Sequence, residues 1–235
     1  MISGLRTIGG VQLGAIVMDW AGVFLLAGMI RYTSLYRKRG RREDKLFFLL
    51  LVTDLLMCLV SAQNNFWQGH DGRMAQSLTL AGNVLFQILF DLYALLVLLH
   101  CFTYFHSPEK TIRRVGLMAK ILFAANLILM LATLPFGLMV TFDEAGMFAF
   151  GRFYYPLGFG VPLLFGLIVL SRILPENPRL FFILSLIFCT RLVGEVWVPG
   201  MSSTPFLLAI ALLFFHIEGM NHAFYSEEEE VRSNG

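Results

Sequence analysis

Charged residues are scarce in this sequence. Only 14% of its 235 residues are Asp, Glu, Lys or Arg, whereas soluble domains carry about 25%. Apolar residues make up 57%, and they come in blocks of which most are longer than about 18 residues, enough for a helix to cross a hydrocarbon core of about 30 Å. The sequence therefore excludes a soluble globular protein and predicts an all-α integral membrane protein.

Recognisable catalytic motifs are also missing. The sequence has no Gly-rich phosphate loop, no HExxH pair and no nucleophile elbow. No lysine follows Lys120, which excludes a retinal Schiff base in the last helix. The three cysteines, Cys58, Cys101 and Cys189, lie in apolar runs without metal-ligand spacing, so we expect them to be buried small hydrophobic residues. The sequence thus predicts no catalytic site, no metal, no cofactor and no nucleic-acid partner.

The apolar runs predict a polytopic bundle of about seven transmembrane helices in one domain, residues 1–225, followed by a short acidic cytoplasmic tail, 226–235. The first run contains Asp19 and has no clear cleavage site after it, so we expect a first helix and not a signal peptide. The fifth run is short and rich in glycine and proline, which leaves a re-entrant segment open as an alternative to a full span. The expected helices are 9–31, 46–67, 78–105, 115–141, 156–174, 180–198 and 203–224.

Positive charge is unequally distributed between the two sides of the expected bundle. Fourteen of the eighteen Lys and Arg residues lie in odd-numbered loops and the C-terminal segment, whereas three lie in even-numbered loops and the N-terminal segment. Cytoplasmic loops carry the excess of Lys and Arg in membrane proteins, so the N-terminus is expected outside and the C-terminus in the cytoplasm. The densest basic segment is YRKRGRREDK, which can attract anionic lipid or dock an acidic cytoplasmic partner. Its lipid-attracting residues are Arg37, Lys38, Arg39, Arg41 and Arg42.

Several polar side chains fall at membrane depth, where a charged group costs at least about 2.5–3.5 kcal/mol. Asn83, Gln87 and Asp91 are spaced four apart and therefore share one face of the third expected helix. This stripe predicts either a ligand cavity or proton or ion path, or an interhelical hydrogen-bond seam that fixes packing. Further intramembrane polar residues stand singly in the sequence: Asp19, Asp54, Asn126, His216 and Glu218.

Arg191 and Glu195 are also four apart, in the outward half of the sixth expected helix. They can pair with each other, or Arg191 can reach Asp54 or Asp91 on a neighbouring helix. A guanidinium in an outward-facing pocket can also hold an anionic ligand. The predicted ligand-binding residues are Asn83, Gln87, Asp91, Arg191 and Glu195.

The layout resembles the seven-helix N-terminal membrane sensor modules of bacterial histidine kinases and diguanylate cyclases. The similar features are the basic first cytoplasmic segment, the run LFFLLL that opens the second helix, and the outer aromatic stretch MFAFGRFYYPLG before the fifth. The resemblance covers about residues 10 to 225 and implies a sensor in the bacterial cytoplasmic membrane whose last helix leads towards an output domain. Because eleven residues follow the seventh expected helix, we expect the output to lie on a separate partner.

The sequence therefore predicts a sensory or receptor-like membrane module that relays a signal to a separate cytoplasmic or membrane partner. Two alternatives remain open. A small transporter or proton-coupled carrier would use the midplane charges and an unwound fifth helix at Gly158, Gly160 and Pro162, although the sequence has no evident two-fold repeat. A membrane scaffold or assembly factor would use the polar stripe for packing alone.

Overall fold

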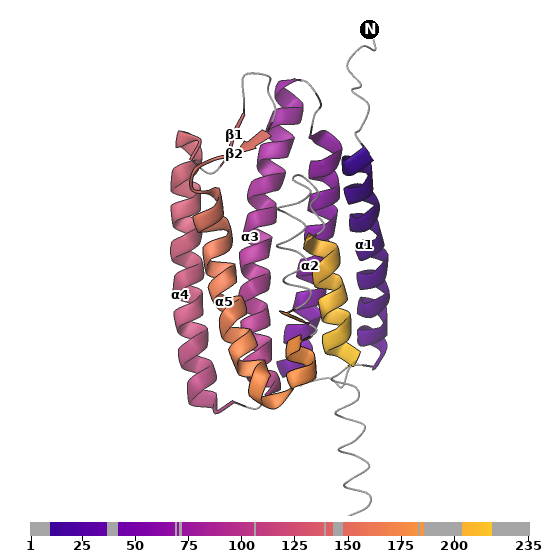
Figure 1. Ribbon diagram of the computed structural model, residues 1–235, viewed down its shortest axis with the longest axis vertical. Coiled ribbons are helices and arrows are strands. Elements are labelled where there is room, and N and C mark those ends of the chain that lie inside the picture. The colour runs from indigo at the N-terminus through magenta and orange to yellow at the C-terminus, as the bar shows by residue number, and fades with distance from the viewer. Residues whose placement is uncertain are drawn as a thin grey trace, which may run out of the picture.

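The computed structural model describes residues 10–36, 42–68, 70, 72–105, 107–138, 140–142, 148–182, 184–185 and 204–217. Helices α1 to α5, taken in chain order, run alternately up and down along the long axis of the molecule (Figure 1). Helical residues continue after the fifth helix at 178–182 and 184–185, and residues 204–217 form the last described helix. The five longer helices are α1 (Gly10–Tyr36), α2 (Arg42–Trp67), α3 (Arg73–Tyr104), α4 (Glu109–Thr133) and α5 (Tyr154–Glu176).

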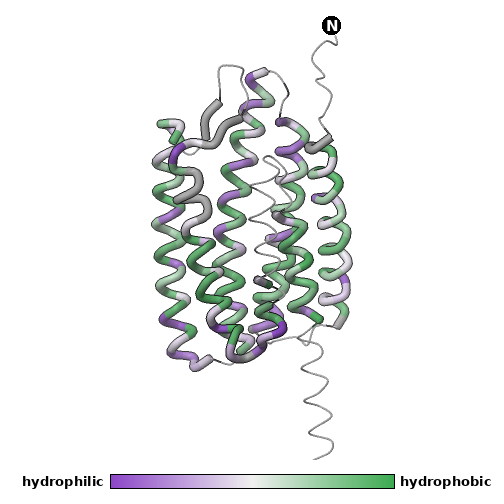
Figure 2. The backbone as a smooth tube through the Cα atoms, viewed as in Figure 1, coloured by the Kyte–Doolittle hydropathy of each residue, from purple (hydrophilic) through white to green (hydrophobic). Residues whose placement is uncertain are grey.

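Four helices are long and apolar enough to cross a membrane, and this confirms the predicted helical membrane architecture in its main feature. Hydrophobic residues cover most of their length in Figure 2. Large apolar side chains also face outward: Phe24 on α1 is 73% exposed, and Met118 and Ile128 on α4 are each 66% exposed. Soluble monomers rarely expose contiguous apolar surface. The four spans are Leu13–Leu35, Glu43–Trp67, Arg73–Tyr104 and Glu109–Phe136.

Several helices begin earlier than the apolar runs predict. α2 begins at Arg42, α3 at Arg73 and α4 at Glu109, rather than at 46, 78 and 115. Hydropathy locates the part of a helix that lies in lipid, whereas backbone hydrogen bonding continues into the polar flank. Acidic residues in the first turn favour this extension because they complement the helix dipole, as Glu43 and Asp44 do in α2.

The region after α4 differs from the predicted long helix. α4 ends at Thr133, and a 3-10 turn, Leu134–Phe136, leads to Gly137, whose φ of 64° is a left-handed conformation that glycine adopts without strain. The strands β1 (Val140–Phe142) and β2 (Phe148–Phe150) then pair antiparallel. This hairpin, which the sequence did not predict, is a small addition to the helical architecture at the end where α4 and α5 approach each other (Figure 1).

α3 is the central helix of the described bundle. It packs against α2, α4 and α5, while α1 packs against α2. One apolar cluster, which includes Leu26 and Leu50, joins α1, α2, α3 and helix 204–217; a second, which includes Leu98 and Phe165, joins α3, α4 and α5. Because α3 has protein on several sides, a polar side chain on it that lacks a partner within the protein is unfavourable.

The two ends of the described bundle differ in positive charge. At one end α2 and α4 begin and α1, α3 and α5 end (Figure 1). We call it the basic end because its cations are Arg31, Lys45, Lys110, Arg113, Arg114, Arg172 and Arg179. The opposite end has Arg73 and Arg152 in the part of the chain that the structure describes.

The last three expected helices are described unequally. α5 is a continuous helix of 23 residues through Pro162, about 35 Å long at about 1.5 Å per residue, so it is not unwound where the carrier alternative required. Residues 186–203 and 218–235 lie outside the described residues. The count of seven helices, the sides of the two termini and the acidic tail therefore stay predictions.

Candidate functional site

Asp91 lies at the centre of a polar seam between α3 and α4. Its carboxylate is fully buried, and its Oδ2 accepts a hydrogen bond of 2.7 Å from Asn126 Nδ2 on α4. Its Oδ1 lies 3.4 Å from the donor Gln87 Nε2, one turn earlier on α3. This is the arrangement that the packing interpretation of the polar stripe requires. A role of Asp91 and Gln87 in ligand binding stays a prediction.

The other predicted ligand residues stand apart from this seam. The Asn83 amide group donates a 2.8 Å hydrogen bond to the Thr79 carbonyl on its own helix. Arg191 and Glu195 lie outside the described residues, as does Glu218. The structure thus brings together Gln87 and Asp91, which the spacing predicted to share a face, and adds Asn126, which the sequence marked only as a separate polar residue.

A second polar seam joins α1 and α2. Asn65 Nδ2 donates a hydrogen bond of 3.1 Å to Asp19 Oδ2 and lies 3.5 Å from Ser61 Oγ. All three residues are buried, and Asp19 Oδ1 has no hydrogen-bond partner among the described residues. Asp19, which stands alone in the sequence, therefore has an amide partner on the neighbouring helix.

Asp54 on α2 differs from Asp19 and Asp91 in its hydrogen bonding. It is fully buried, and neither carboxylate oxygen has a hydrogen-bond partner in the part of the chain that the structure describes. Its electrostatic neighbours are Cys58 on α2 and Tyr93 on α3. A buried polar group without a partner is unfavourable, and ionisable residues at membrane depth commonly serve function. The predicted contact of Asp54 with Arg191 stays a prediction.

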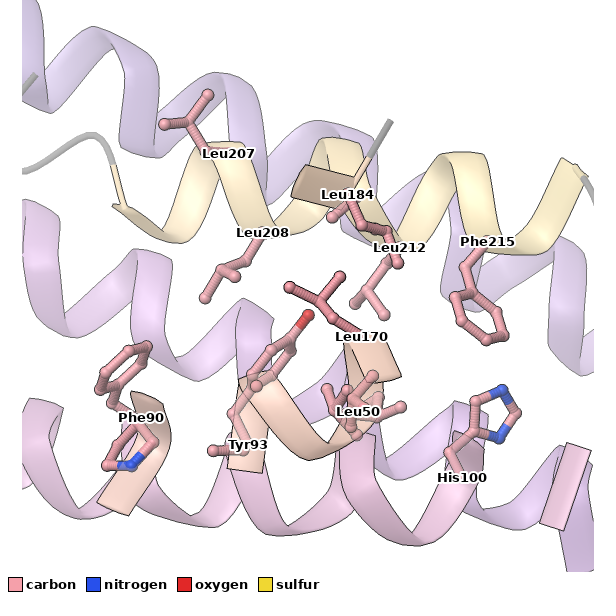
Figure 3. A pocket seen from close by; sticks show the side chains of 16 residues that line it. Leu50, Phe90, Tyr93, His100, Leu170, Leu184, Leu207, Leu208, Leu212 and Phe215 are labelled. Atoms are coloured by element: carbon pink, nitrogen blue, oxygen red, sulfur yellow. The ribbon is translucent and has the colours of Figure 1, made fainter. Parts of the chain in front are cut away.

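A cavity of about 150 Å³ lies between α2, α3, α5 and helix 204–217. Figure 3 shows its walls, which consist mainly of aliphatic and aromatic side chains from all four elements. Asn83, Gln87 and Asp91 are not among the described residues that line it. The labelled apolar residues of the wall include Leu50, Phe90, Leu170, Leu208, Leu212 and Phe215.

Tyr93 brings a polar atom into this apolar space. Its side chain is 6% exposed, and its hydroxyl points towards Leu170 and Leu208 in Figure 3. The hydroxyl makes no hydrogen bond with any residue that the structure describes. A tyrosine hydroxyl donates one hydrogen bond and accepts others, so Tyr93 offers an unused polar contact inside the cavity.

Rings gather where the cavity approaches the basic end. His100 lines the cavity, and its ring centroid lies 5.6 Å from that of Phe47 and 5.3 Å from that of Phe215. The Phe47 ring stacks on His216 at 5.2 Å. The His100 imidazole also lies close to the backbone of Glu43 at the start of α2, and its Nδ1 has no hydrogen-bond partner among the described residues. We call Phe47, His100, Phe215 and His216 the ring cluster; it joins α2, α3 and helix 204–217.

Sequence reasoning missed Tyr93 and the cavity. Tyr93 stands in the middle of the third apolar run, away from both membrane interfaces where tyrosine is usually enriched. That position was the available signal, because a buried hydroxyl needs either a partner or an accessible space. The cavity itself has no local signature, since its walls come from four elements that are distant in the sequence.

The described residues form a cavity of simple chemistry. Apolar walls and one accessible hydroxyl can hold a small molecule by burial of its surface and by one hydrogen bond. Among the described residues there is also no group of three His, Cys, Asp or Glu side chains that could hold a metal ion. No protein-family model matches the chain and no curated protein matches it, so the functional argument rests on this geometry.

Proposed function

We propose that the chain is a receptor-like membrane module that binds a small ligand within its helix bundle and relays that event to a separate cytoplasmic partner. The observation that carries the proposal is the cavity between α2, α3, α5 and helix 204–217. A ligand can shift an equilibrium between two helix arrangements only by contacting them differently. A cavity bounded by four elements supplies contacts of that kind.

The proposal includes seven transmembrane helices in a bacterial cytoplasmic membrane, with the N-terminus outside and the C-terminus in the cytoplasm. The distribution of cations between the ends of the bundle supports this orientation, because cytoplasmic segments carry the excess of Lys and Arg. Lys110 and Arg113 at the start of α4 and Arg179 after α5 belong to the basic end. On this orientation Arg37 to Arg42 face the anionic lipid of the inner leaflet.

The ring cluster supports a relay from the cavity to the basic end. His100 lines the cavity on one side and lies close to the backbone of Glu43, within the basic segment, on the other. At the same end Arg172 on α5 donates a hydrogen bond of 3.2 Å to the Phe105 carbonyl after α3. A movement of α3 or helix 204–217 at the cavity therefore reaches the segments that a cytoplasmic partner would contact.

The two alternatives have less support from specific observations. α5 is continuous at Gly160 and Pro162, which removes the broken helix on which the carrier alternative relied. The seam of Asp91, Gln87 and Asn126 agrees with a scaffold, yet a scaffold has no use for the cavity. Transport of a ligand across proteoliposomes would favour a carrier over a receptor.

Filling the cavity by mutation tests the relay without knowledge of the ligand. Gly166 on α5 lines the cavity, and a Cβ added there meets nothing within 4 Å, so Gly166→Leu places a side chain in open space. The matched control is Gly160→Leu on the same helix, where an added Cβ also meets nothing within 4 Å but the residue does not line the cavity.

Spin labels at Lys110→Cys and Arg179→Cys, in a chain whose native cysteines are replaced, report the geometry of the basic end in lipid nanodiscs. We expect Gly166→Leu to shift the distance distribution between the labels by about 1–2 Å, the size of helix movements in switching proteins. The Gly160→Leu control should leave it unchanged. Identical distributions in the native protein and in Gly166→Leu would refute the relay.

A further inference from the structure

We propose that the cavity takes a small, uncharged, mostly apolar molecule of about one ring in size, held by a hydrogen bond from the Tyr93 hydroxyl to a single ligand oxygen. This inference rests on the proposed receptor function and names its ligand class. The volume sets the size. A cavity of roughly 150 Å³ lined by leucine, isoleucine and phenylalanine is known to bind benzene, and this cavity has about the same volume and a similar lining.

The apolar lining of the cavity indicates that the ligand is uncharged. Leu50, Leu208 and Leu212 surround the space together with other apolar side chains (Figure 3). A charge buried against such walls without a counter-ion is strongly unfavourable, and no Lys or Arg is among the described residues that line the cavity. The ligand that fits these walls is uncharged.

The position of Tyr93 indicates where the polar atom of the ligand lies. Its hydroxyl points into the cavity and makes no hydrogen bond with the described part of the chain (Figure 3). A hydroxyl that faces apolar walls gains from a hydrogen-bond partner, so a carbonyl, ether or alcohol oxygen opposite Tyr93 makes a contact that a pure hydrocarbon lacks. The second polar group is His100, whose ring packs against that of Phe215 and whose Nδ1 atom is itself buried, without a hydrogen-bond partner among the described residues.

Two probes of the same shape separate the hydrogen bond from apolar burial. Cyclohexanone carries one acceptor oxygen, and methylenecyclohexane has a CH₂ group in its place. Each is titrated into the full chain in lipid nanodiscs by calorimetry. We expect Tyr93→Phe to weaken cyclohexanone binding about fivefold, the factor that one hydrogen bond contributes. The same substitution should leave the affinity for methylenecyclohexane unchanged.

The cavity variant distinguishes binding in the protein from partition into lipid. Both probes dissolve in the nanodisc bilayer, so the heat measured with Gly166→Leu is subtracted from that of the native protein. We expect Gly166→Leu to lose saturable binding of both probes and Gly160→Leu to retain it. Each variant is first checked for native helix content and for elution as a single species.

Several outcomes would overturn the inference. These are equal binding by the native protein and Gly166→Leu, or a cyclohexanone affinity that Tyr93→Phe leaves unchanged. A co-purified lipid acyl chain that neither probe displaces would likewise assign the cavity to lipid. The relay is judged separately from the spin-label distances, so cyclohexanone binding without a distance shift in Gly166→Leu upholds the ligand class and rejects the receptor function.

Discussion

Within the described chain, buried polar groups have hydrogen-bond partners on one side of α3 and lack them on the other. Towards α4, both Asp91 oxygens accept hydrogen bonds, from Gln87 and Asn126. Towards α2 and helix 204–217, the Tyr93 hydroxyl and both Asp54 oxygens have no hydrogen-bond partner among the described residues. A fully bonded polar cluster specifies one packing arrangement, whereas an incompletely bonded one is unfavourable until something else supplies the partner. Burial alone does not distinguish the two roles; the presence of a partner does.

The largest expected effect on stability comes from removing a hydrogen bond on the side of α3 that faces α4. Asn126→Leu removes the 2.7 Å donor to Asp91 and leaves that buried oxygen unsatisfied, so we expect a loss of about 2–3 kcal/mol in the free energy of unfolding. The measurement is reversible unfolding in mixed micelles of increasing dodecyl sulfate content. The matched control is Asn83→Leu, because among the described residues the Asn83 side chain bonds only a carbonyl of its own helix. Equal losses in the two variants would contradict the seam.

The next effect concerns the close approach of α2 and α3. A Cβ added at Gly82 would overlap the buried carboxamide of Asn64, so we expect Gly82→Ala to destabilise the protein by about 1–2 kcal/mol, as overpacking does. Gly28→Ala on α1 is the control, since its Cβ would meet nothing within 4 Å. Alanine also favours the helix over glycine there by about 0.5–1 kcal/mol. The same unfolding assay measures both variants. A Gly82→Ala protein as stable as the native protein would contradict the close packing of Gly82 against Asn64.

A smaller effect distinguishes two aspartates of equal burial. Asp91→Asn replaces one of two accepting oxygens with a donor group that faces other amide donors, and we expect it to cost about 1 kcal/mol. Asp54→Asn has no hydrogen bond to lose within the described residues and should change stability by less than about 0.5 kcal/mol. Unfolding of both variants in parallel makes the comparison. A larger loss for Asp54→Asn would reveal a partner of Asp54 and remove the contrast.

The smallest expected effect is at Tyr93. Because its hydroxyl has no protein partner in the described chain, Tyr93→Phe should leave the free energy of unfolding within about 0.5 kcal/mol of the native value. Tyrosine hydroxyls that are hydrogen-bonded typically contribute about 1 kcal/mol. A loss of that size in ligand-free protein would mean that the cavity hydroxyl is already satisfied, and it would weaken the ligand proposal.

Much of the architecture was predictable because it depends on local composition. The apolar runs located four spanning helices, and the spacing of Gln87 and Asp91 correctly placed them on one face of α3. Helix starts such as Arg73 were missed because polar residues form helix as readily as apolar ones. The hairpin of β1 and β2 was missed because three-residue strands leave almost no periodic pattern.

The candidate site was predictable only in part. Asp91 and Asn126 were both recognised as polar groups at membrane depth, but their contact spans 35 positions of the chain and depends on how α4 is rotated against α3. Tyr93 and Gly166 acquire their significance from a cavity whose walls lie on four elements. Hydrophobic periodicity reports which residues avoid water; it carries no information about which of them leave a space.

By itself the amino-acid sequence determined that this chain forms long apolar helices suited to a bilayer, because transfer into lipid is a sum over neighbouring residues of one helix. It also marked the polar groups at membrane depth, of which Asp19, Asp54, Gln87, Asp91 and Asn126 are buried in the structure. Only the tertiary structure decided which of these groups have partners, since a hydrogen bond or a cavity wall depends on the distance and rotation of helices that are far apart along the chain. For this reason Asp91 became part of a packing seam, while Tyr93 was left facing a space that a ligand can fill.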